Sequence, residues 1–414
     1  MSELPNAPLA KQIPKNLTIH DDVRIDEFYW LNDRENPEVI DYLNKENDYY
    51  NAHTSHTKDF QVSLFDEMKS RIKEDDSSVP YKYNGYWYIT KYEKGKDYPI
   101  YVRKKETLEA AEELLFDCNE MAKDPGNFIL NQFCEFGNHV GHYEVTGRAL
   151  AHAFEHVKAN GHSDIRLAAF TSATGSAGTI AAGDRLKDIY GTKIVAVEAL
   201  ECPTMLENGF GEHNIQGIGD KHIPLIHNVM NTDVVVGVSD RATDELDVLF
   251  NAPAGQQYLA SRHGFSAELI DALTHFGFSA ICNVLAAIKT AKLMGYGAND
   301  AIVTIATDGG ALYPSERVKT IAGRFKGEFT AVDAAEIFSE HLGSVSTDNM
   351  IDCTERDRNR IFNLGYYTWV EQQGTPLDVF EARRSQSFWR SVRSYAPVWD
   401  NLITEFNARV AKAS

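Results

Sequence analysis

Residues 164–182, DIRLAAFTSATGSAGTIAA, run from a short apolar segment through a loop of small residues into the start of a helical pattern. Small residues let a backbone approach a ligand closely, and the N–H groups at a helix start carry the positive end of its dipole. Such a loop suits phosphate, although neither the dinucleotide fingerprint nor the P-loop pattern is present, and a purely structural turn is the alternative. The residues predicted to bind the phosphate are Gly175, Ser176, Ala177, Gly178 and Thr179.

Apolar segments on both sides of this loop continue the alternation of strand and helix. The strands are expected at residues 164–172, 193–199, 233–238 and 301–307, and helices at 179–190 and 280–294. Strands that are apolar throughout and separated by helices are typical of a parallel sheet buried on both faces. The predicted fold is therefore α/β, with a three-layer parallel sheet over residues 127–330 and a mainly helical tail over 331–414.

The first 125 residues differ in composition, because they hold only two of the 28 glycines but eleven of the 19 tyrosines. Residues 36–47 combine an early proline, acidic residues in the first turn and helical apolar spacing, which predicts a helical arm within residues 1–75. The tyrosines that follow alternate with polar residues across an Asn84-Gly85 turn. This pattern predicts a short antiparallel meander over residues 76–122.

The charge and the apolar pattern of the chain exclude several classes of partner. A net charge of -19 repels nucleic-acid phosphates, so nucleic acid is not an expected partner. No apolar run approaches the roughly 20 residues that span a bilayer, and the first twenty residues contain no signal-peptide core. Five widely spaced cysteines show no metal-ligand spacing. The chain is expected to be cytoplasmic, without membrane contact and without a metal.

Several segments in the later part of the chain follow the order and spacing of one known family. They are residues 131–133 (NQF), 142–147 (HYEVTG), 175–179 (GSAGT), 193–198 (KIVAVE), 214–224 (NIQGIGDKHIP) and 277–283 (GFSAICN). Together they resemble the cysteine synthase family of fold-type-II pyridoxal-phosphate enzymes. The resemblance implies that the loop binds the phosphate of pyridoxal 5'-phosphate and that Thr307 or Asp308 contacts its pyridine nitrogen. A carboxylate there would keep the nitrogen protonated, whereas a hydroxyl would leave it neutral.

The amino-terminal segments follow a second pattern. They are residues 24–31 (RIDEFYWL), 36–39 (NPEV), 64–68 (LFDEM), 71–80 (RIKEDDSSVP), 95–99 (GKDYP) and 117–123 (DCNEMAK). Residues 21–122 resemble the amino-terminal region of the prolyl oligopeptidase family, particularly oligopeptidase B. This resemblance implies that the meander is the start of a β-propeller. The Gly-x-Ser-x-Gly nucleophile elbow that the catalytic domain of that family needs does not occur in the sequence.

The two resemblances describe a hybrid whose parts join near residues 120–126. In the cysteine synthase family the lysine that forms the Schiff base lies upstream of the Gln-Phe motif, and here the peptidase-like segment stands in that place. Lys73 follows Ser70-Arg71-Ile72, but its context belongs to the peptidase pattern. No catalytic residue is therefore assigned.

The sequence thus predicts a cysteine synthase-like pyridoxal-phosphate protein, a lyase or transferase by resemblance, for β-replacement or elimination on an amino acid. It is expected to be inactive, because the Schiff-base lysine segment is missing. A small amino acid is the substrate if the protein is active, and a homodimer is allowed. The group His139, His142 and Glu144 is interpreted as structural or cofactor-proximal. Two alternatives stay open: a serine peptidase amino-terminal fragment without its catalytic domain, and a non-catalytic fusion product.

Overall fold

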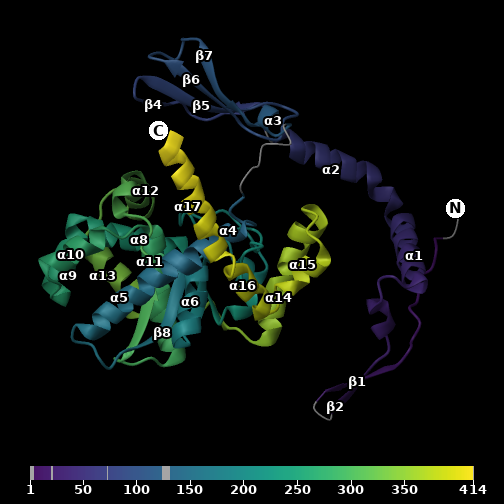
Figure 1. The fold of residues 1–414 in the computed structure, drawn as a ribbon. Coiled ribbons are helices and arrows are strands. Elements are labelled where there is room, and N and C mark those ends of the chain that lie inside the picture. The colour runs from purple at the N-terminus through teal and green to yellow at the C-terminus, as the bar shows by residue number, and fades with distance from the viewer. Residues whose placement is uncertain (1–3, 20–21, 72, 124–130, 414) are drawn as a thin grey trace. The chain divides into compact units, whose positions relative to one another are not determined.

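The computed structural model describes residues 4–19, 22–71, 73–123 and 131–413. The chain forms two compact units, Met1–Ile129 and Leu130–Ser414, and each is described by itself (Figure 1). The predicted junction near residues 120–126 and the predicted domain start at 127 fall mostly within 124–130, outside the described residues.

The first unit begins with two short strands and continues into two helices. Its first elements are β1 (Lys15–Ile19), β2 (Asp22–Asp26), η1 (Tyr29–Asn32), α1 (Pro37–Thr54), η2 (Ser55–Thr57) and α2 (Lys58–Ser70). α1 starts where the sequence predicts a helix, because Pro37 takes its first position and the Asn36 side chain accepts a hydrogen bond from the Glu38 N–H. The β1–β2 hairpin differs from the expected helical arm. Its apolar residues Val23 and Ile25 are exposed, so no buried face marks it in the sequence.

The same unit contains an open antiparallel sheet, as the alternation of tyrosines predicts. Its strands are β3 (Asp76–Ser77), β4 (Tyr81–Tyr83), β5 (Tyr86–Tyr92), β6 (Ile100–Lys105) and β7 (Glu112–Asp117), followed by α3 (Cys118–Met121). β3 and β4 both pair with β5, so the sheet is four strands wide, the width of one propeller blade. Asn84 and Gly85 have φ angles of 47° and 82° and join β4 to β5 as a two-residue hairpin loop.

The second unit is built on a five-stranded sheet in the order β11-β8-β9-β10-β12. The strands are β8 (Arg166–Ala173), β9 (Lys193–Ala199), β10 (Val234–Val238), β11 (Asp300–Thr304) and β12 (Met350–Asp352). β8 to β11 are parallel to one another, which confirms the four predicted strands and their direction. β12 pairs antiparallel with β10 and was not expected, because the tail over residues 331–414 is predicted to be mainly helical.

Helices cover both faces of this sheet, and the strand residues alternate between two cores. Val195 and Val236 pack in one core with α11 (Phe278–Met294) and α8 (Asp240–Asn251). Ile194 and Val235 pack on the other side with α14 (Glu355–Tyr366). On that side α5 (Gly147–Ala159) and α6 (Ala181–Tyr190) also lie side by side over β8 (Figure 1). Burial of every position of β9 and β10 after Lys193 explains why these strands carry no polar side chain except Glu198.

The remaining helices of the second unit connect the strands or form the tail. Before β11 they are α4 (Phe136–Gly141), η3 (His142–Thr146), α7 (Thr204–Glu207), η4 (Val229–Asn231), α9 (Pro253–His263) and α10 (Ala267–Thr274). After β11 they are η5 (Gly310–Leu312), α12 (Pro314–Arg324), α13 (Ala331–Phe338), η6 (Ser339–Gly343), η7 (Tyr367–Gln372), α15 (Leu377–Ala382), α16 (Gln386–Arg393) and α17 (Ala396–Ala413). The tail is mainly helical, as predicted, with β12 as its interruption.

A buried ionic group fixes α16 of the tail to α6. The Arg393 Nη2 donates to the Asp184 Oδ2 at 2.5 Å, and both side chains are buried. His139 Nε2 lies 3.7 Å from the same carboxylate. Burial, together with the Arg393 charge, lowers the pKa of His139 to about 3, so this imidazole is neutral. The tail is therefore packed into the second unit as part of its fold.

In the part of the chain that the structure describes, no single helix has the length and apolar character needed to cross a membrane. The bent pair α10 and α11, whose axes meet at 117°, reaches that length and composition only when both helices are taken together.

Candidate functional site

The loop between β8 and α6 lies at the carboxyl edge of the parallel sheet. β8 is paired on both sides, and beyond its end the Thr174 N–H donates to the Val197 carbonyl of β9 at 2.9 Å. Open α/β sheets bind ligands outside the carboxyl ends of their strands. The position of the loop is thus one where a ligand site is expected.

A cavity of about 80 Å³ lies on this loop. Its lining comes from the β8–α6 loop, a neighbouring turn, the first turns of α11 and the segment after β11. The lining residues are Ser172, Ala173, Thr174, Gly175, Ser176, Ala177, Gly178, Thr179, Gly217, Ile218, Ser279, Asn283, Ile305 and Thr307. One water needs about 10–15 Å³ on this measure, so the cavity accepts a group the size of several waters, such as a phosphate. All five predicted loop residues and Thr307 line it, whereas Asp308 does not.

The backbone N–H groups of residues 175–179 are open to a ligand. Within the described part of the chain, none of these five groups donates to a protein acceptor. Ala177 has a φ of 64°, in the left-handed region that a non-glycine residue rarely enters. Consecutive N–H groups around such a residue form a concave anion-binding nest, here just before α6.

Two glycines keep neighbouring groups close to the loop. A Cβ on Gly178 would lie 2.4 Å from the Asn138 Oδ1, and a Cβ on Gly175 would lie 3.1 Å from the Gly217 carbonyl oxygen. The Asn138 Nδ2 lies 3.5 Å from the Ser176 Oγ. Glycine at 178 therefore lets the Asn138 amide stand directly against the loop.

The buried side chain of Asn283 separates the ends of β8 and β11. Its Oδ1 accepts a hydrogen bond from the Ala173 N–H at 2.7 Å, and its Nδ2 donates to the Ile305 carbonyl at 2.9 Å. One amide thus replaces the next bonds of the strand ladder and leaves room for the cavity. Asn283 lies in the segment 277–283 that resembles the cysteine synthase family, but it was not predicted to be a site residue.

Thr307 and Asp308 have different surroundings. Thr307 lines the cavity, and its Oγ1 is 2.9 Å from the Ser279 Oγ. Asp308 accepts hydrogen bonds from the Ser279 hydroxyl at 2.5 Å and the Tyr313 hydroxyl at 2.6 Å. Both carboxylate oxygens of Asp308 therefore accept hydrogen bonds from the protein. Of Thr307 and Asp308, only Thr307 lines the cavity.

Two buried polar residues, Thr174 and Glu198, line a smaller cavity next to the loop cavity. The Thr174 Oγ1 is buried and has no hydrogen-bond partner, and Thr174 lines both this cavity and an adjacent one of about 20 Å³. Glu198 lines the smaller cavity and accepts backbone N–H groups of Met205 and Leu206, each at 2.9 Å. Burial nevertheless raises the pKa of Glu198 to about 7. Buried hydroxyl groups normally have a hydrogen-bond partner. The unpartnered Thr174 hydroxyl therefore fits a site in which a polar ligand supplies that partner.

No lysine is among the residues that line the loop cavity. Lys73 lies in the first unit, where its exposed ammonium pairs with Asp76 at 2.7 Å.

His139, His142 and Glu144 do not converge as a metal site in the described structure. The His142 Nδ1 lies 2.9 Å from the Thr146 Oγ1, and Glu144 pairs with Arg185 at 3.1 Å. His139 is buried against the tail. The three side chains therefore have structural partners.

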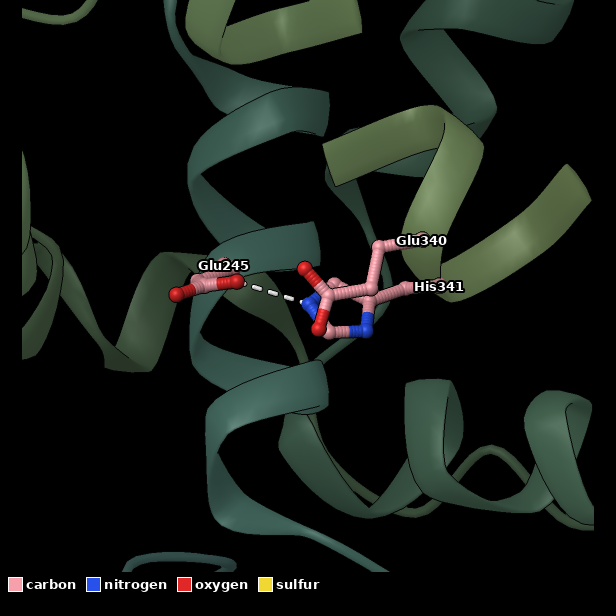
Figure 2. A group of neighbouring side chains, drawn as sticks. All are labelled: Glu245, Glu340 and His341. Carbon is pink, nitrogen blue, oxygen red and sulfur yellow. Dashed lines mark hydrogen bonds and ion pairs between the residues drawn. The ribbon is translucent and has the colours of Figure 1, made fainter. Parts of the chain in front are cut away.

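A different group has the donor set of a metal site. Glu245 of α8 and Glu340 and His341 of η6 place one ligand atom each within 4.8 Å of one another. Figure 2 shows Glu245 facing the other two, with the His341 Nε2 2.6 Å from its Oε2. Arg241 already occupies the cation position, because its Nε donates to Glu245 at 3.0 Å and its Nη2 to Glu340 at 2.8 Å. One guanidinium thus bridges the two carboxylates and offsets part of their charge.

Comparison with known proteins gives a family match in the amino-terminal region. The family described as prolyl oligopeptidase, N-terminal beta-propeller domain, matches residues 8–136, which extends past the predicted boundary at 122. Protease 2 of Moraxella lacunata is 37% identical over 122 residues, 28% of this chain and 18% of that protein. The chain spans about a fifth of the length of the first curated relatives that it matches.

A second set of similarities concerns cysteine synthases. Cysteine synthase B of Campylobacter jejuni is 30% identical over 144 residues, 34% of this chain and 43% of that protein. A solved structure of a hydrogen sulfide-producing enzyme from Fusobacterium nucleatum is 23% identical with a TM-score of 0.39, over 53% of this chain and 57% of that one. Both resemblances predicted from the sequence are thereby confirmed: the chain combines similarity to the amino-terminal region of prolyl oligopeptidases with similarity to cysteine synthases.

Proposed function

We propose that the second unit binds pyridoxal 5'-phosphate through residues 175–179, as a cysteine synthase-like protein without turnover. The observation that carries this proposal is the run of five backbone N–H groups without a protein acceptor on a cavity of phosphate size. The start of α6 adds the positive end of a helix dipole. The orphaned Thr174 hydroxyl and the Ser176 and Thr179 side chains add neutral donors.

The groups around the cavity also fit the ring of this cofactor. Thr307 lines the cavity, and its hydroxyl would donate to the pyridine nitrogen in place of the Ser279 Oγ, which leaves that nitrogen neutral. Pyridoxal phosphate supplies an electron sink for amino-acid chemistry when it is bound.

The same lining argues against catalysis. It contains no lysine, and a site without that amine lacks both the covalent attachment and the base that moves the α-proton. We therefore expect non-covalent cofactor binding and no β-replacement or elimination. We also expect no peptide hydrolysis, because the chain has no Gly-x-Ser-x-Gly elbow.

The test is calorimetric titration of the full chain with pyridoxal phosphate, inorganic phosphate and pyridoxal. The proposal expects pyridoxal phosphate and phosphate to compete for one site and pyridoxal, which lacks the phosphate, to bind at least about tenfold more weakly. The variant Gly178→Ala should weaken phosphate binding about tenfold, because the new Cβ displaces Asn138 into the nest. The matched control is Gly141→Ala, whose Cβ would meet nothing within 4 Å.

Equal affinity for pyridoxal and pyridoxal phosphate would refute the phosphate site. Catalysis is tested separately, by reduction with borohydride and mass-spectrometric mapping. A stoichiometric pyridoxyl-lysine at one position, together with β-replacement activity that is lost when this lysine is mutated, would show that the protein is an active enzyme.

A further inference from the structure

A second cavity of about 280 Å³ lies elsewhere at the carboxyl edge of the same sheet. It is enclosed by the end of β10, the start of α8, the middle of α11, η6 and the loop at residues 344–349. The lining residues are Leu200, Gly237, Val238, Ser239, Arg241, Ala242, Leu285, Lys289, Glu340, His341, Ser344, Val345, Ser346, Asp348 and Asn349. None of them lines the loop cavity, so the two sites are distinct.

Two cations and two carboxylates meet in this cavity. Lys289 is 8% exposed, and its Nζ donates to the Asp348 Oδ1 at 2.8 Å. Arg241 donates to the Glu340 Oε2 at 2.8 Å. A buried lysine is costly unless it is paired, so its position inside a cavity requires a polar occupant or a permanent partner. Asp348 supplies the partner from an exposed position, with 64% of its side chain accessible.

The rest of the wall is apolar or neutral. Leu200, Val238 and Leu285 form a buried or half-buried apolar side, and three serines are among the other lining residues. Apolar walls with a few convergent polar groups are the usual make-up of small-molecule sites, and 280 Å³ is just below the roughly 300 Å³ at which pockets for drug-sized ligands begin.

We propose that this cavity binds a free α-amino acid with a small apolar side chain, as a zwitterion. The four formal charges of the wall, those of Arg241, Lys289, Glu340 and Asp348, sum to zero, so a ligand of net charge would leave one wall group unmatched. In a zwitterion the carboxylate meets Lys289 and Arg241, and the ammonium meets Glu340 and Asp348. The apolar side chain lies against Leu200, Val238 and Leu285.

A divalent cation is the competing occupant, and the geometry argues against it. Glu245, Glu340 and His341 face one another (Figure 2), but the Arg241 guanidinium bonds both carboxylates. Arg324 adds a second cation 3.6 Å from the Glu245 Oε1. A metal would have to displace these guanidinium groups.

The experiment is isothermal titration of the full chain with L-valine, isovalerate and isobutylamine. The two analogues keep the side chain of valine, and each lacks one of its charges. The proposal expects L-valine to bind and both analogues to bind at least about tenfold more weakly. Lys289→Met and Glu340→Gln should each weaken valine binding about tenfold. The matched controls Lys319→Met and Glu316→Gln remove an ion pair on α12 between an exposed lysine and a half-buried glutamate outside the cavity, and they should leave binding unchanged.

Three results would overturn the proposal: no binding of L-valine at about 10 mM, equal binding of either analogue, or valine binding that neither cavity variant changes. If Lys289→Met fails to fold, Glu340→Gln decides, because Glu340 is exposed. Titration with zinc in place of valine tests the competing occupant, and tight zinc binding that is lost in Glu245→Gln would also refute the proposal. None of these results depends on pyridoxal phosphate, so this site and the loop site can fail independently.

Discussion

The antiparallel sheet β3–β7 and the parallel sheet β8–β11 bury their apolar side chains to very different extents. Among the described residues of the first unit, the buried apolar side chains are Val39, Ile100 and Val102. In the second unit every residue of β10 is buried. Tyr81 of the first sheet is 62% exposed. A parallel sheet brings its own covering helices through its crossovers, whereas an antiparallel blade needs a neighbour to cover its faces.

This difference predicts unequal protection from hydrogen exchange in the intact chain. A small open sheet with few buried side chains is only marginally stable. Amides of β5 and β6 should exchange about a thousandfold faster than amides of β9 and β10, equivalent to about 4 kcal/mol of local opening free energy. Mass spectrometry of exchanged peptides measures it. Equal protection of the two sheets would show that the blade is covered by another surface.

The second prediction contrasts a buried ion pair with an exposed one. Arg393→Met should lower the free energy of unfolding of the second unit by about 3 kcal/mol, because it leaves the Asp184 carboxylate buried without its cation. The amides of Asn228 and Asn231 remain bonded to that carboxylate, which keeps the cost at the lower end of the usual range. Urea unfolding measures the change.

The control for that measurement is Lys73→Met in the first unit. It removes an ion pair whose lysine side chain is 73% exposed, and stability should not change. If both variants are equally harmless, the tail is not fixed by the buried pair.

The third prediction concerns acid. Burial lowers the pKa of His139 to about 3 and that of His227 to about 4, below the ordinary value of 6.5. As the pH falls below 6.5 the unfolded chain takes up protons that the folded unit does not, so stability is full above this pH and is lost below it. Between pH 6.5 and 5.5 the second unit should lose about 2 kcal/mol, about 1 kcal/mol for each histidine.

Urea unfolding at several pH values measures this dependence, and His227→Asn should reduce its slope by about half. The exposed His152 supplies the matched control, because His152→Gln should leave the slope unchanged. A slope that survives in His227→Asn would mean that other groups cause the acid sensitivity.

The smallest expected changes in stability come from two glycines whose added Cβ would meet nothing within 4 Å. Gly85 has a φ of 82° in the hairpin loop, so Gly85→Ala should cost the first unit about 1 kcal/mol from backbone strain alone. Gly323 lies within α12 with nothing within 4 Å of its Cβ position. Gly323→Ala should stabilise the second unit by up to about 1 kcal/mol, since alanine favours the helix. Thermal unfolding separates the two signs, and a neutral Gly85→Ala would mean that the hairpin loop tolerates rearrangement.

The sequence by itself determined the local elements. Continuous apolar runs predicted β8 to β11 because each strand is buried on both faces, and Asn84-Gly85 predicted the hairpin because only a few residues accept its positive φ angles. The loop at 175–179 was identified from residue size and its place before a helix. All of these signals lie within a few neighbouring residues.

Only the tertiary structure decided which distant residues meet. Asn283 bonds the Ala173 N–H from 110 positions away, and Arg393 pairs with Asp184 across 209 positions. Tertiary contacts also keep Asp308 out of the lining of the loop cavity and bring Lys289 to Asp348. Sequence periodicity reports only how a segment faces its surroundings, whereas a cavity is made of contacts between segments. The residues of the second cavity therefore form no recognisable motif in the sequence.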